Sequence, residues 1–175
     1  MMPPLRRFNF LGRVLHWTMA LLVLTMLFLG IGMITTVSHT YAALVTIHKS
    51  LGILILALVA IRLVNRLINP PPALPADLPP SQLFMAKASH LMLYVLMFAL
   101  PVVGWAMLSA AGYPIIIFGS LSLPAILPHD IAMFAILRTT HTVLAFTLFM
   151  IFLAHLGAAL FHLLVRKDEV FPSML

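Results

Sequence analysis

Eight histidines occur in a chain of 175 residues that has only four acidic residues and no cysteine. Histidine can bind a transition metal, carry a proton or change its charge near neutral pH. An ionisable side chain is costly inside a membrane, so one within a long apolar segment indicates a functional site. His39 and His129 fall between such segments and need no special role. The others fall in or beside them: His16, His48, His90, His141, His155 and His162.

The composition predicts that the elements holding these histidines cross a membrane. Hydrophobic residues make up 63% of the chain and charged residues 8%, whereas soluble domains average about 45–50% and about 25%. Runs of about 20 apolar residues are long enough to span a bilayer as helices. We therefore expect residues 1–175 to form one all-α membrane domain, a four-helix bundle with spans at about 14–33, 47–67, 89–108 and 139–165.

The same composition excludes several classes of protein. A chain this apolar is not disordered. Without cysteine it cannot ligate an iron–sulfur cluster, attach c-type haem covalently or form disulfides. No nucleic-acid partner is expected, and membrane lipid is the surrounding partner that the long apolar runs require.

The basic residues predict the orientation of the bundle. Lys49 and Arg138 lie on one side of the predicted spans. Eight of the ten lie on the other side, which the positive-inside rule assigns to the cytoplasm together with both termini. The proline-rich segment 69–80 is then an extended cytoplasmic linker. The apolar segment 109–138 is an outer loop lying in the membrane interface. The eight are Arg6, Arg7, Arg13, Arg62, Arg66, Lys87, Arg166 and Lys167.

The spacing of the histidines places four of them at two depths. His141 and His155 are 14 residues apart, which is roughly 21 Å along a helix and about 40° short of four full turns. Both therefore lie on one face of the last span. His48 enters its span at the depth of His141, and His16 lies at the depth of His155. The sequence predicts one histidine pair near each membrane surface.

Two imidazoles on facing helices are what a bis-histidine haem b requires, because they fill both axial positions of the iron. Such a six-coordinate centre suits electron transfer more than oxygen binding. Gly52, four residues after His48, would leave room for a porphyrin. The cations Arg13, Arg138 and Lys49, each close to a ligand in sequence, would bind the propionates. Zinc or a proton relay are alternatives, but carboxylates and cysteines are missing near the pairs. We predict two haem b groups, with iron ligands His16, His155, His48 and His141.

Three further residues near the cytoplasmic side could form a polar niche. Histidine and lysine supply the hydrogen-bond donors and protons that a quinone head group needs. His90 and His162 lie at that depth, and Lys87 is three residues before His90. The sequence equally allows that the two histidines only cap helix ends at the level of the lipid headgroups.

These residues resemble the bacterial cytochrome b561 family, which is related to the cytochrome b subunits of hydrogenases and formate dehydrogenases. The likeness covers nearly the whole chain. Two positions depart from the family pattern. Thr142 follows His141, where relatives usually have an acidic residue. Leu163 follows His162, where relatives often have a second histidine. The matching stretches are Leu15-His16-Trp17, His48-Lys49-Ser50-Leu51-Gly52, Arg62, Arg66, His90-Leu91-Met92-Leu93-Tyr94, Leu100-Pro101-Val102-Val103-Gly104-Trp105, His141, His155, Ala158-Ala159-Leu160, His162 and Arg166-Lys167-Asp168.

The resemblance implies a diheme electron carrier of the bacterial inner membrane that exchanges electrons with quinone. It implies one haem held by His16 with His155 and another held by His48 with His141. Some members oxidise superoxide at the outer face. We therefore expect electrons to pass from a periplasmic donor, superoxide among the candidates, to membrane quinone. One alternative is an anchor subunit that relays electrons for a partner redox enzyme, and another is a haem-free transporter or channel bundle. A partner subunit or a homo-oligomer is also possible.

Overall fold

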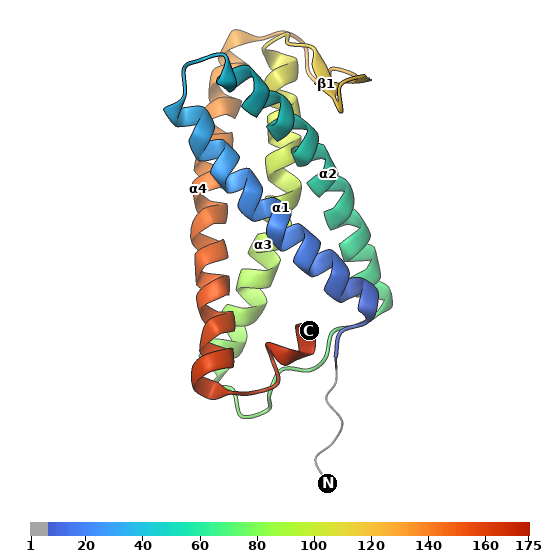
Figure 1. Cartoon of the computed structure of the whole chain (residues 1–175), viewed down its shortest axis with the longest axis vertical. Helices are drawn as coiled ribbons and strands as arrows, with labels where there is room; N and C mark the ends of the chain where they lie inside the picture. The colour runs from blue at the N-terminus through green and yellow to red at the C-terminus, as the bar shows by residue number, and fades with distance from the viewer. Residues whose placement is uncertain (1–6) are drawn as a thin grey trace.

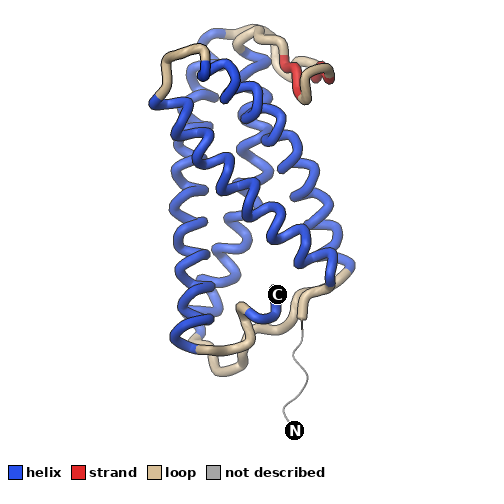
Figure 2. Tube along the Cα trace, viewed as in Figure 1, coloured by secondary structure: helices blue, strands red, loops and turns tan. Residues whose placement is uncertain are grey.

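The structure is a computed structural model that describes residues 7–175; Arg6, which counted toward the predicted orientation, lies outside them. Figures 1 and 2 show four long helices side by side, a small hairpin at one end, and the C-terminal segment at the other. The elements follow the order α1 (Phe10–Thr35), α2 (Thr40–Ile68), α3 (Pro80–Ala110), β1 (Ile115–Ile117), β2 (Leu121–Leu123), α4 (Ile131–Phe161), a π-helical turn (His162–Arg166) and a 3-10 turn (Pro172–Met174).

The helices confirm the predicted all-α bundle of four spans. Each is long and apolar enough to cross a membrane, and each encloses one of the predicted segments, α4 doing so together with the π-helical turn that follows it. The linker from 69 to 79 is not helical. α3 begins at Pro80, where a proline suits the first turn because its missing N–H has no helical partner there.

The connection between α3 and α4 differs from its predicted bounds. α4 begins at Ile131, not at about residue 139. Its start is set by Asp130, whose carboxylate accepts a hydrogen bond from the Met133 N–H (2.9 Å) and so caps the helix. The predicted outer loop at 109–138 is therefore too long, and the connection covers residues 111–130.

This connection contains a β-hairpin. β1 pairs antiparallel with β2, and Ile115 lies opposite Leu123. Ile115 and Ile117 are buried while Ile116 between them is exposed, the alternation expected of a strand with one covered face. The Phe118 N–H donates to Ser50 Oγ (3.0 Å), which ties the hairpin to α2.

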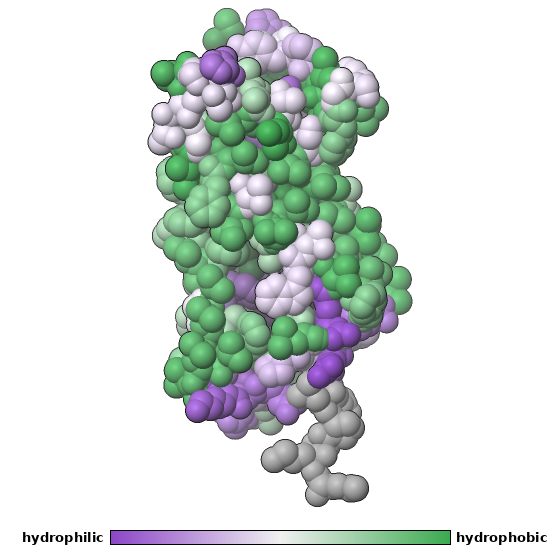
Figure 3. Space-filling view, viewed as in Figure 1, coloured by the Kyte–Doolittle hydropathy of each residue, from purple (hydrophilic) through white to green (hydrophobic). Residues whose placement is uncertain are grey.

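The bundle has a small core and a largely apolar exterior. Buried side chains from all four helices meet in one central cluster: Val23, Ile55, Leu96, Leu100 and Leu148. Many other apolar side chains face outward. Figure 3 shows them as a broad apolar belt, with hydrophilic residues gathered mainly at the end where α1 begins. That pattern suits a bundle whose sides face lipid, because lipid tails do not penalise exposed apolar surface.

Two helical hairpins make up the bundle. α1 packs against α2, and α3 packs against α4, over more of their lengths than α2 packs against α3. The C-terminal segment then folds back to α1. Trp17 Nε1 donates to the Met174 carbonyl (2.8 Å), and the Phe8 N–H donates to the Ser173 carbonyl (3.1 Å). The two ends of the described chain are thus joined.

A pair of amides joins the first turn of α1 to the last turns of α2. Asn9 Nδ2 donates to Asn65 Oδ1 (2.8 Å), and Asn65 Nδ2 donates back to Asn9 Oδ1 (3.1 Å). Asn9 Oδ1 also accepts from the Gly12 N–H (3.0 Å), so Asn9 caps α1. A Cβ on Gly12 would lie only 2.6 Å from Asn9 Oδ1 and 3.3 Å from Asn65 Nδ2. Glycine at this position therefore lets the amide pair form.

We expect Gly12→Ala to lower the thermal unfolding temperature of the protein in detergent. The added methyl group displaces Asn9, and losing an N-cap costs about 0.5–2 kcal/mol. Gly30→Ala is the matched control, because a Cβ there meets no atom within 4 Å. Alanine favours a helix over glycine by about 1 kcal/mol, so the control should unfold at the same or a higher temperature. Equal midpoints for the two variants would contradict the role given to Gly12.

Candidate functional site

Two histidines from α2 and α4 face each other at the end of the bundle that carries the hairpin. The ring centres of His48 and His141 are 6.2 Å apart, with an interplanar angle of 65°. The Nδ1 atoms of both rings are buried and have no hydrogen-bond partner among the described residues. A buried polar atom without a partner needs an explanation, and an absent ligand or ion is one.

Toward the other end of the bundle, α1, α3 and α4 bring three imidazoles together. The ring centres of His16 and His155 are 6.3 Å apart, with an interplanar angle of 81°. His90 on α3 lies on another side of His155, with ring centres 5.4 Å apart. α4 is a continuous α-helix through His141 and His155, so the two levels are roughly 21 Å apart along it.

The ring separations test whether a metal ion fits between the imidazoles. Directly hydrogen-bonded rings have nitrogen atoms about 2.9 Å apart and centres about 5.1 Å apart. Imidazole nitrogens bind transition metals at about 2.0–2.1 Å, which places the centres of two opposed rings about 6.3 Å apart. The separations of 6.2 Å and 6.3 Å match the second geometry. The 5.4 Å between His90 and His155 is too short for it. The two pairs thus have the centre-to-centre separation of two imidazoles on one metal ion, which is also within the range of edge-to-face ring contacts.

Arg62 was predicted only as part of the charge bias and of the family pattern, not as a site residue. Its Nε donates to Tyr94 Oη (3.2 Å), and its NH1 donates to the Gly12 carbonyl (3.3 Å). The guanidinium lies close enough to influence His16, His90 and His155 electrostatically. An arginine within an apolar segment is itself a signal of function, and here it supplies a fixed positive charge beside the inner histidines.

The cations predicted to bind propionates take different positions. Arg13 NH1 donates to the main-chain oxygen of Leu175, and its Nε is buried without a partner. Arg13 therefore binds the C-terminal segment beside His16. Arg138 on α4 is exposed, and Lys49 on α2 is partly exposed. The side chains of Lys49 and Arg138 make no hydrogen bond or ion pair among the described residues, although the Thr142 hydroxyl donates to the Arg138 carbonyl (3.0 Å).

A glycine that leaves room at the His48–His141 pair comes from α3. A Cβ on Gly104 would lie 3.3 Å from Cε1 and 3.6 Å from Nδ1 of His141. Gly104 thus lets α3 approach the imidazole face. Gly52, which was predicted to leave room for a porphyrin, is buried beside Met26 of α1. A Cβ on Gly52 would lie 3.7 Å from Met26 Cε. Nothing in the local sequence relates Gly104 to His141, because the two belong to different helices.

His162 and His90 do not meet in any described interaction. His162 Nδ1 lies 2.7 Å from Asp168 Oδ2. The same oxygen accepts from Arg166 Nε (2.9 Å), and Arg166 also pairs with Asp77 of the linker. Partial burial raises the pKa of Asp168, but hydrogen bonds from His162, the Val170 N–H and Arg166 outweigh it and hold that pKa below its ordinary value. Lys87 is exposed on α3.

A four-helix bundle of membrane-spanning length, with opposed histidines at two depths, has the architecture of a membrane-bound cytochrome b. Comparison with known sequences supports that class. The family model described as "Prokaryotic cytochrome b561" matches residues 7–175. The chain belongs to the prokaryotic cytochrome b561 family.

Individual relatives match at similar levels. "Cytochrome b561 homolog 2" of Escherichia coli (strain K12) is 34% identical over 172 residues, covering 97% of this chain and 91% of that protein. "Cytochrome b561 homolog 1" of the same organism is 28% identical over 179 residues, covering 98% of each. A "Probable superoxide oxidase CybB" of Yersinia pestis is 34% identical over 133 residues, covering 74% of this chain and 73% of that protein.

Family membership carries three conclusions. The chain is a multi-pass protein of the bacterial inner membrane. It is a b-type haem protein of electron transport, and an oxidoreductase is the kind of activity that the family and its relatives indicate.

We expect Gly104→Val to reduce the haem content of the purified protein. The added side chain on α3 crowds the His141 ring, because a Cβ at position 104 would already lie 3.3 Å from His141 Cε1. Gly157→Val is the control, because it makes the same change in an open position close to His155. Both variants carry the same cost of a β-branched residue in a helix. The measurement is the ratio of haem to protein. Equal ratios in the two variants would contradict the close packing of Gly104 against His141.

Proposed function

We propose that the chain binds two b haems and carries electrons across the membrane from a periplasmic donor to quinone. One haem would be held by His48 with His141, and the other by His16 with His155. The observation that supports this most directly is the pair of ring separations, 6.2 Å and 6.3 Å, which leave space for one iron atom at each level.

When bound, each haem would supply a one-electron carrier. The role of the protein would be to hold a pair of imidazoles at each of two depths in the membrane. Since α4 contributes one histidine to each level, the spacing of roughly 21 Å along that helix covers most of a hydrocarbon core about 30 Å thick. Arg62 would stabilise negative charge beside the inner pair, because its guanidinium is held by Tyr94 and the Gly12 carbonyl.

The distribution of charge supports an orientation with both termini in the cytoplasm. The helix order places the start of α1, the end of α2, the start of α3 and the end of α4 at one end of the bundle (Figure 1). Lys49 and Arg138 lie toward the opposite end. By the positive-inside rule, the end richer in cations is cytoplasmic. Its basic residues in the described chain are Arg7, Arg13, Arg62, Arg66, Lys87, Arg166 and Lys167.

Superoxide is the donor that we propose at the periplasmic end. A relative covering most of the chain is named a probable superoxide oxidase. Lys49 directly follows His48, and Arg138 is three residues before His141. These two cations, from α2 and α4, would attract a small anion toward the outer pair.

Quinone would be reduced at the cytoplasmic end. Two superoxide ions give up one electron each and leave as dioxygen, while one quinone gains two electrons and two protons to become quinol. His90 lies beside His155, and His162 shares a hydrogen bond with Asp168. These two histidines would supply hydrogen-bond donors and proton carriers for the carbonyls of a quinone head group.

Replacing one axial histidine is expected to leave the protein with one haem. His141→Ala should lose the outer haem and His16→Ala the inner one, because alanine offers no ligand. The measurements are the ratio of haem to protein and a redox titration, in which each variant should lose a different component. His39→Ala is the control, since His39 is exposed in the loop before α2. An unchanged haem ratio in His141→Ala would refute the outer assignment.

The cations at the outer end are expected to increase the rate of reaction with superoxide. The double variant Lys49→Gln with Arg138→Gln should reduce quinone several-fold more slowly at low ionic strength when superoxide is the donor. The rate should also depend less on salt, because salt screens the attraction in the native protein. Lys167→Gln removes a charge from the opposite end and serves as the control. A double variant with native rate and salt dependence would argue against superoxide capture by these residues.

A further inference from the structure

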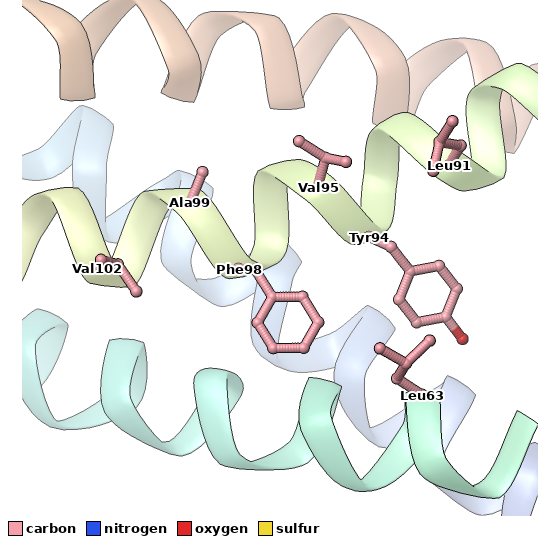
Figure 4. A pocket seen from close by; sticks show the side chains of 7 residues that line it. All are labelled: Leu63, Leu91, Tyr94, Val95, Phe98, Ala99 and Val102. Atoms are coloured by element: carbon pink, nitrogen blue, oxygen red, sulfur yellow. The ribbon is translucent and has the colours of Figure 1, made fainter. Parts of the chain in front are cut away.

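An open apolar groove runs along the outside of the bundle between α2 and α3, where the two helical hairpins meet less closely. Its volume is about 510 Å³. In Figure 4, Tyr94 and Phe98 point from α3 toward α2, and Leu63 points back from α2. The remaining walls come from α3: Leu91, Val95, Ala99 and Val102.

The groove has the length of one lipid leaflet. Its walls on α3 extend from Leu91 to Val102, which is roughly 16 Å of helix, and half of a hydrocarbon core is about 15 Å. Leu91 is 63% exposed and Val95 is 48% exposed, so the groove opens toward lipid. An extended hydrocarbon chain lying parallel to the helices would fill it.

Cations from both helices lie at one end of this groove. Arg66 is three residues after Leu63 on α2, and its guanidinium carbon lies 5.7 Å from the centre of the Tyr94 ring. Lys87 is one helical turn before Leu91, on the same side of α3. The ion pairs found in the described chain join His162 and Arg166 to Asp77 and Asp168. Neither Arg66 nor Lys87 takes part in them.

We propose that the groove is a binding site for an anionic phospholipid, with one acyl chain along α3 and the phosphate between Arg66 and Lys87. The apolar length accounts for the chain, and the two unpaired cations account for the negative headgroup. That the groove opens to the cytoplasmic leaflet rests on the orientation proposed above. The site itself does not depend on the haems.

The charge at the groove end favours this occupant over two others. A quinone tail would fit the apolar part, but its head group is neutral and gains little from two cations. A second copy of the chain would bring its own cations to the same place. An anionic headgroup gains about 1 kcal/mol from each Lys or Arg near it, which is about a fivefold change in affinity for each charge.

The test is native mass spectrometry of the full haem-loaded protein in detergent, titrated with dioleoylphosphatidylglycerol or dioleoylphosphatidylcholine. The wild type should bind the anionic lipid about 25-fold more tightly, since two cations contribute about fivefold each. Arg66→Gln and Lys87→Gln should each reduce that preference about fivefold. Lys167→Gln removes an exposed charge from the same end and should change nothing. Ala99→Leu fills the groove and should weaken both lipids while keeping the cations.

Several outcomes would overturn the proposal. Equal affinity for the two lipids would do so, as would a loss of lipid preference in Lys167→Gln equal to that in Arg66→Gln and Lys87→Gln. Ubiquinone that stays bound in every variant except Ala99→Leu would make quinone the occupant. A dimer that the groove variants dissociate would make a second copy of the chain the occupant. The haem ratio and unfolding temperature of the same samples show that each variant is folded. A wild type that prefers the anionic lipid but lacks two haems would overturn the proposed function alone.

Discussion

The bundle depends on burying imidazoles in an apolar interior without leaving them unpartnered. Water cannot reach the middle of a membrane, so a buried ring nitrogen must find a protein group or a bound ligand. His48 and His141 have Nδ1 atoms with no partner in the described chain, and their rings stand apart by the width of an iron atom and its two bonds. Iron ligation by these two rings, as proposed above, would meet that requirement.

Each helix contributes differently to placing the buried imidazoles. α4 carries a histidine at each level and is unbroken between them, so one regular helix sets the depth of both. α2 and α1 each supply one opposing ring. α3 supplies no histidine whose ring centre lies 6.2–6.3 Å from that of a histidine on α4. It contributes Gly104, which allows close approach to His141, and His90, which contacts His155. The amide pair of Asn9 and Asn65 then holds α1 and α2 in a fixed relation.

The cations at the end of the bundle where α1 begins do not act as one uniform charge. Arg13 holds the C-terminal segment, and Arg62 faces the inner histidines. Arg166 joins the linker to the end of α4 through Asp77 and Asp168. Arg66 and Lys87 remain at the groove between α2 and α3. The charge bias that we propose to orient the chain would thus also supply a contact to the C-terminal segment, a charge near the histidines and the proposed lipid site.

The sequence by itself determined the number of spans, and it placed four histidines at two depths. Both follow from local physics, because bilayer thickness sets the length of an apolar run and the helical repeat sets which residues share a face. The hairpin and the early start of α4 were missed, since the Asp130 cap is a single side-chain contact within a segment that is apolar on both sides of it.

Only the tertiary structure decided that Arg62 is held by Tyr94 and the Gly12 carbonyl, that Gly104 lies against His141 and that Arg13 binds the C-terminal segment. Each of these depends on how one helix is rotated against another. Helices that are apolar on nearly every side carry little pattern to specify that rotation, so it is set by close packing between side chains far apart in the chain.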